Sequence, residues 1–174
     1  MFVPNRLNID EIDAAFELAV GLGCGAFVTG PMMRIGRAAL HWDEIACSEA
    51  QWNKAVEKLR ELSSANTRTA LSIYPWDIVT EMERRLQNPQ AMLLVVPNGT
   101  VKLLNALPFA AADLRRQSLS DAWRAYRESW RAPEVREFVE SCRTRPALLR
   151  HANEIWPIGR PRRSRIEVRS DSTR

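Results

Sequence analysis

The sequence predicts an α/β (or α+β) fold: an incomplete parallel β/α barrel segment followed by a β-hairpin and helices. Three observations predict this class. Helical and strand-like apolar patterns alternate through the first half of the chain, two apolar runs flank an Asn-Gly pair, and amphipathic helical patterns follow. Alternating helices and strands are typical of a parallel sheet, and an Asn-Gly pair between apolar runs is typical of a hairpin turn.

The first half begins with a helix. Asn8 and Glu11 have the spacing of a capping box, and apolar residues recur at helical spacing until Gly23 supplies a C-terminal stop. A short buried strand is expected in residues 24–30. Residues 31–46 are expected to form a loop.

The next elements repeat this order. A helix is expected over residues 48–64, where Ser48 and Gln51 form a second capping box and apolar residues share one face. A strand over residues 68–74 follows. The helix expected over residues 75–88 has a proline near its first turn, where proline is tolerated.

The second half begins with a hairpin over residues 93–109. Asn98 and Gly99 form its turn, because both residue types adopt the positive φ that such turns need. A helix is expected after Ser118, and two short helices, each opened by a proline, complete the chain. The predicted apolar face of the first of these helices contains Leu119, Ala122, Trp123, Tyr126 and Trp130.

These elements divide the chain into three parts. Residues 1–88 are the expected barrel segment, residues 89–159 the hairpin and helical extension, and residues 160–174 a basic, disordered tail. A parallel sheet of two or three strands rarely stands alone, because both of its faces must be covered. The first part is therefore expected to be half of a larger fold.

Charge is concentrated in the tail. The formal net charge is +4. Residues 160–174 contain six arginines and two acidic residues, so they account for all of it. The neutral remainder makes nucleic acid an unexpected partner, although the arginines leave contact with nucleic acid or an acidic protein as an alternative. The sequence shows neither a signal peptide nor an apolar run of about 20 residues, so we expect a cytoplasmic protein without membrane contact.

Chemistry-bearing motifs are few. Cys24, Cys47 and Cys142 lack the spacing of a metal or iron–sulfur site, so no metal ligands are expected, and the two histidines have no clustered partners. Nucleophile elbows, phosphate-binding loops and zinc-protease motifs are absent from the sequence. No catalytic residue is assigned.

The segment PMMRIGRA, residues 31–38, is the best candidate for ligand contact, because it follows a strand at the carboxyl end, where α/β folds bind ligands. Arg34 and Arg37, with Gly36 between them, are positioned to hold a carboxylate or an acidic peptide. The alternative is that the arginines form ion pairs with Asp43 or Glu44.

Two motif groups resemble the C-terminal SPASM-type extension and late barrel of radical S-adenosylmethionine (SAM) enzymes, which include maturases of ribosomal peptides and quinone cofactors. The resemblance covers roughly residues 3–131. The motif residues are Pro31, Arg34, Gly36, Arg37 and Ala38, then Pro97, Asn98, Gly99, Asp113, Leu114, Arg115, Ser118, Leu119, Asp121 and Trp123.

The resemblance implies the C-terminal part of a peptide- or cofactor-maturation protein. It implies that Arg34, Gly36 and Arg37 face SAM or substrate. Five residues would be structural motif residues of the extension: Asn98, Gly99, Asp113, Arg115 and Trp123.

The complete family protein uses SAM and a [4Fe-4S] cluster, but this chain lacks the CxxxCxxC motif. It also lacks the auxiliary cysteines expected near Ala91 and near Leu104 or Asn105, and Ala112 replaces the glycine of the motif. The chain alone is therefore expected to hold no cofactor. It would act as an enzyme only when completed by an N-terminal barrel half.

The expected partners are that missing half or a second copy of the chain, together with a peptide substrate. The alternative function is a stand-alone degenerate scaffold that binds a peptide or partner protein.

Overall fold

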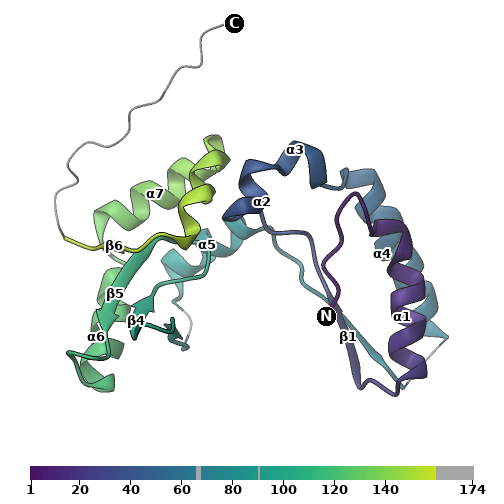
Figure 1. Ribbon diagram of the computed structural model, residues 1–174, viewed down its shortest axis with the longest axis horizontal. Helices are drawn as coiled ribbons and strands as arrows, with labels where there is room; N and C mark the ends of the chain where they lie inside the picture. Colours follow the sequence, from purple (N-terminus) through teal and green to yellow (C-terminus); the bar gives the residue numbers. More distant parts are fainter. Residues whose placement is uncertain (66–67, 90, 160–174) are drawn as a thin grey trace, which may run out of the picture.

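The computed structural model describes residues 1–65, 68–89 and 91–159; the predicted basic tail over residues 160–174 lies outside the described residues. The protein is a mixed helix and sheet structure, which confirms the α/β character of the prediction. Two lobes are visible, bridged by short helices (Figure 1). Each lobe has its own hydrophobic core.

The N-terminal lobe is a helix-covered pair of parallel strands, and Ala26 of the first strand lies opposite Ala70 of the second. Its elements are η1 (Ile9–Glu11), α1 (Ile12–Gly21), β1 (Ala26–Thr29), α4 (Glu49–Ser64) and β2 (Ala70–Ile73). Helices α1 and α4 pack against each other beside the strands (Figure 1). The buried core residues are Ile9, Ile12, Phe16, Phe27, Ala55 and Leu59.

Local sequence explains most helix ends in this lobe. The capping box of Ser48 and Gln51 is confirmed, with the Gln51 amide donating to the Ser48 hydroxyl over 3.2 Å. The capping box predicted at Asn8 is wrong: the side chain of Asn8 accepts from the Asn5 amide over 2.7 Å, and the 3-10 turn η1 precedes α1. At the other end of α1, Gly23 adopts a φ of 69°, as a C-terminal stop requires.

Residues 31–46 differ from the loop that the sequence predicts. They contain two one-turn helices, α2 (Arg37–Leu40) and α3 (Trp42–Ile45), which bridge the two lobes (Figure 1). Helices of four residues are shorter than the window in which apolar periodicity can be recognised. Tertiary contacts stabilise α2 instead, because it packs against η2 (Pro146–Asn153) of the C-terminal lobe.

The C-terminal lobe contains a four-stranded sheet in the order β3-β4-β5-β6, antiparallel except for the parallel pair β5 and β6. Besides η2, its elements are α5 (Ile78–Gln87), β3 (Leu94–Val95), β4 (Thr100–Lys102), β5 (Phe109–Asp113), α6 (Leu119–Ser129), α7 (Pro133–Thr144) and β6 (Trp156–Pro157). The hairpin, the Ser118 cap and the proline-opened α7 are as predicted.

Several details of this lobe correct the prediction. The sequence did not predict β5 or β6, and the last short helix is the 3-10 helix η2. Asp77 caps α5, so Pro75 precedes that helix rather than lying in its first turn. Leu119 is 64% exposed and is not on the buried face of α6.

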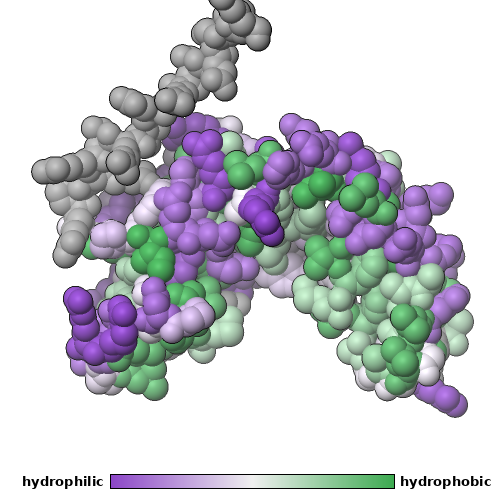
Figure 2. Space-filling model, in the orientation of Figure 1, coloured by the Kyte–Doolittle hydropathy of each residue, from purple (hydrophilic) through white to green (hydrophobic). Residues whose placement is uncertain are grey.

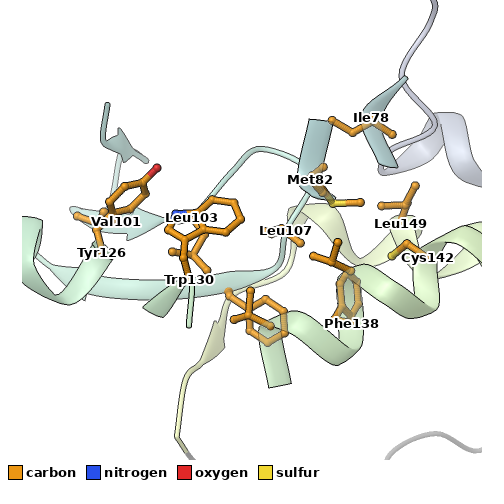
Figure 3. Close-up of a cluster of buried hydrophobic side chains, with 14 of the residues drawn as sticks. Ile78, Met82, Val101, Leu103, Leu107, Tyr126, Trp130, Phe138, Cys142 and Leu149 are labelled. Carbon is orange, nitrogen blue, oxygen red and sulfur yellow. The ribbon is translucent and has the colours of Figure 1, made fainter. Parts of the chain in front are cut away.

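Large side chains fill the core of this lobe. Trp130, Tyr126 and Leu107 are almost completely buried, and they line up with Met82 of α5 between the sheet and the helices (Figure 3). Helix α5 therefore packs into the second core, although it belongs by sequence to the predicted segment 1–88. Within the described ranges, no helix combines the length and the apolar character needed to cross a lipid bilayer.

Candidate functional site

A pocket of about 390 Å³ lies between the lobes, near the carboxyl ends of β1 and β2. The segment after β1 contributes Met32 and Arg34, and the segment after β2 contributes Asp77 at the start of α5. Both chain segments reach the pocket because parallel strands end at the same edge of a sheet. The volume lies within the range of small-molecule sites.

The pocket walls are largely apolar and come from both lobes. Trp42 of α3, Trp52 of α4, Ile78 of α5 and Leu149 of η2 all line it. Ile78 and Leu149 also lie close together at one end of the C-terminal core (Figure 3). The pocket is therefore anchored in well-packed structure on the C-terminal side.

Arg34 is the positively charged side chain that lines the pocket. Its guanidinium carbon lies 5.4 Å from the centre of the Trp42 ring, a cation–π arrangement. Its Nε is buried without a hydrogen-bond partner among the described residues. The ion pairs with Asp43 or Glu44 that the sequence offered as an alternative do not form. A carboxylate oxygen of Glu44 instead lies 3.5 Å from Nδ1 of His41. The guanidinium thus lines the pocket without an ion pair to a carboxylate of the described part of the chain, although Asp77 and Glu49 line the same pocket.

Gly36 and Arg37, the other two residues predicted to contact a ligand, do not line the pocket. The Gly36 amide donates to the carbonyl of Leu149 over 3.0 Å, and a Cβ on Gly36 would lie 2.7 Å from Nδ2 of Asn153. This close approach and a φ of 54° require glycine, so Gly36 fixes the segment that carries Arg34. Arg37 is exposed at the start of α2, and it does not line the pocket.

The remaining ionisable groups of the pocket do not form a nucleophile. Burial raises the pKa of the Cys47 thiol above 9.0, so this residue is protonated at neutral pH. Burial also raises the pKa of Asp77, but hydrogen bonds from Thr80 and Val79 outweigh this effect and lower the pKa below 3.8. Asp77 is therefore a carboxylate that caps α5.

The five motif residues of the extension lie in the C-terminal lobe, and four of them meet at the hairpin turn. Arg115 donates to both carboxylate oxygens of Asp113, over 2.9 and 2.8 Å. Side-chain and backbone hydrogen bonds from Arg115 lower the pKa of Asp113 to about 2. Gly99 packs against Arg115, and its carbonyl accepts from the Leu114 amide. These contacts brace the turn.

The turn also refines the predicted geometry. The amide of Gly99 donates to Val96, so Pro97 and Asn98 are the central residues of the bonded turn, and Gly99 follows with a φ of 82°. This is the three-residue hairpin loop with a glycine in the left-handed region. The fifth motif residue, Trp123, stacks on Tyr126 with ring centres 5.6 Å apart.

The residues present do not fit the iron–sulfur cluster that the resemblance implies. Among the residues that the structure describes, no three histidine, cysteine, aspartate or glutamate side chains gather closely enough to hold a metal ion. Burial raises the pKa of the Cys142 thiol to about 12, within the C-terminal core. A cluster binds thiolates, so no step of a reaction can be assigned to a cluster on the described residues.

The sequence indicated Arg34 but missed the residues around it. Trp42, Asp77 and Leu149 come from three elements that are far apart in the chain. In the sequence, the position of Asp77 shortly after a predicted strand was the indication that this residue could line a site. Comparisons with family models, with curated proteins and with solved structures gave no match to this chain.

Proposed function

We propose that this chain is the C-terminal part of a radical SAM/SPASM-like protein of peptide or cofactor maturation. It would close the barrel and shape the substrate pocket, while a separate N-terminal half would carry the CxxxCxxC motif, its [4Fe-4S] cluster and SAM. The chain alone would not be catalytic. The single observation that carries this proposal is the open parallel sheet of the N-terminal lobe.

That sheet is covered on one face only. Phe27 points to the helices and is buried, whereas Ala26 and Val28 of β1 are exposed on the opposite face. Ala70 and Ser72 of β2 are exposed in the same alternation. Parallel strands in α/β proteins have both faces covered, so the exposed face fits a barrel interior that another chain completes.

The N-terminal segment supports the same arrangement. The Phe2 amide donates to the carbonyl of Val28 over 2.9 Å, and the rings of Phe2 and Phe27 stack 6.3 Å apart. The neighbouring carbonyl, of Thr29, accepts from Tyr74 beyond β2. Successive carbonyls of a strand point to opposite edges, so residue 2 lies on the edge of β1 that faces away from β2. Further strands would extend the sheet there.

The alternative function is a stand-alone scaffold that binds a peptide or a partner protein. The pocket lined by Arg34 favours it, because residues of this chain alone form a pocket of about 390 Å³. This alternative requires a monomer that unfolds cooperatively without a partner.

Co-expression tests the proposal. The DNA beside the coding region is sequenced, and an adjacent reading frame that carries CxxxCxxC is expressed together with this chain. We expect a one-to-one complex on gel filtration. Val28→Asp on the exposed sheet face should abolish the complex, and Leu18→Asp, on the exposed side of α1, should leave it intact.

Two results would contradict the proposal. One is a stoichiometric cluster absorbance after anaerobic treatment of this chain alone with iron and sulfide. The other is a monomer that unfolds cooperatively and does not bind any such second chain. This result would favour the scaffold.

A further inference from the structure

The pocket between the lobes contains an arginine, Arg34, that forms no ion pair with the described residues. Arg34 lines the pocket, its Nε has no acceptor, and the ion pairs of the described residues join other side chains. The terminal nitrogens of an arginine that lines a pocket can donate to a bound anion, and such charge-assisted hydrogen bonds are stronger than neutral ones. The arrangement therefore favours an anionic ligand.

Acidic side chains in the same pocket limit the charge of that anion. Asp77 and Glu49 both line the cavity with Arg34. A phosphate group of nearly two negative charges would be repelled by these two carboxylates. A singly charged carboxylate meets less repulsion, and its two oxygens match the planar guanidinium.

The walls determine what the carboxylate is attached to. Two indole rings, Trp42 and Trp52, and the aliphatic side chains of Ile78 and Leu149 surround the cavity. Such walls exclude water and favour an apolar group of similar size. The cation–π contact of the Arg34 guanidinium with the Trp42 ring favours a fixed position of the guanidinium in the pocket.

We propose that this pocket binds a carboxylate attached to an apolar group, and that Arg34 is the residue that recognises the carboxylate. Two sources share this chemistry: a small apolar acid, and the C-terminal carboxylate of a peptide that ends in an apolar residue. The inference depends on the pocket and not on the radical SAM resemblance, so the failure of either proposal leaves the other standing.

Matched ligands test the proposal on the unmodified protein. N-acetyl-leucine is compared with N-acetyl-leucinamide by isothermal titration calorimetry, with NMR spectra of the indole N–H groups as a second readout. We expect the acid to bind at least about tenfold more tightly than the amide, the loss typical of one charge-assisted hydrogen bond. Equal affinities, or no binding of either compound, would overturn the proposal.

Matched variants identify the residue. Arg34→Met should weaken binding of the acid at least about tenfold and leave binding of the amide unchanged. The control is Arg37→Met, which removes the same charge three residues away on the exposed surface. Equal weakening by both variants would show a long-range charge effect and would contradict the assignment. Thermal melting verifies that each variant folds, and Arg34→Lys replaces Arg34→Met if the latter does not.

A third arm separates the two sources. A heptapeptide that ends in leucine with a free carboxylate is compared with N-acetyl-leucine and with its own C-terminal amide. Tighter binding of the free peptide than of the small acid assigns the pocket to peptide C-termini. Binding of the small acid alone assigns it to a free acid. Loss of binding in the peptide amide is expected in the first case.

Discussion

The two lobes of this protein differ in how far the rest of the chain buries their sheets. In the C-terminal lobe the strand β4 is buried along its whole length, and seventeen buried residues form one cluster. In the N-terminal lobe alternate residues of both strands are exposed, and the cluster contains six buried residues. Because buried apolar area provides most of the stability of a domain, the N-terminal lobe should be the less stable of the two.

The comparison also bears on the partner proposed above. The C-terminal lobe covers its own sheet with elements from the same chain, among them α6, which packs against β4 and β5 (Figure 1). The space-filling view shows a wide notch between the lobes on the side away from the bridging helices (Figure 2). A partner that enters this notch would contribute most to the lobe whose sheet is open.

The largest expected effect is in the C-terminal core. Trp130 is 1% exposed and contacts the Tyr126 ring, so Trp130→Ala should lower the free energy of unfolding by about 3–5 kcal/mol in urea titrations. The Trp130 Nε1 has no hydrogen-bond partner in the described structure, so Trp130→Phe, which also removes it, should cost much less. Equal losses for both variants would show that ring contacts are not the cause.

Leu59→Ala tests the independence of the lobes. Leu59 is fully buried in the N-terminal core, and its truncation should cost about 2–5 kcal/mol. Hydrogen exchange should become faster in α1 and α4 and stay unchanged in β4 and β5, because the two cores share no residue. Uniformly faster exchange in both lobes would mean that they unfold as one unit.

A smaller effect is expected at the start of α4. Ser48→Ala removes the hydroxyl that accepts from the Gln51 backbone amide and should cost about 1 kcal/mol in the transition of the N-terminal lobe. Ser63→Ala, near the other end of the same helix, is the control and should stay within about 0.5 kcal/mol of wild type. Chemical denaturation followed by circular dichroism measures both.

The smallest effect concerns the exposed pair in the extension. Because the folded-state pKa of Asp113 is lowered from 3.8 to about 2, its pairing with Arg115 stabilises the protein above pH 3.8. This contribution is lost as the pH falls from 3.8 to about 2. Asp113→Asn and Arg115→Ala should both flatten the stability profile in that window, measured by thermal melting. A wild-type slope in either variant would show that the pair does not affect stability.

Local sequence predicted the elements whose formation depends on near neighbours. The Ser48 and Ser118 caps, the proline at the start of α7 and the Gly99 turn are set by bonds within three residues. The sequence did not predict β5, because the alanines at residues 110–112 have low strand propensity and form a strand only between β4 and β6.

The candidate site also combines a feature that local sequence predicted with features that depend on tertiary packing. The sequence alone identified Arg34 as a cation that follows a strand, and thereby the end of the sheet where a ligand would bind. Only the tertiary structure decided that Arg34 forms no ion pair with the described residues, lies over the Trp42 ring and shares a pocket with Leu149, which lies 115 positions later in the chain. A residue type fixes which contacts are chemically available, but burial and long-range packing determine which of them form.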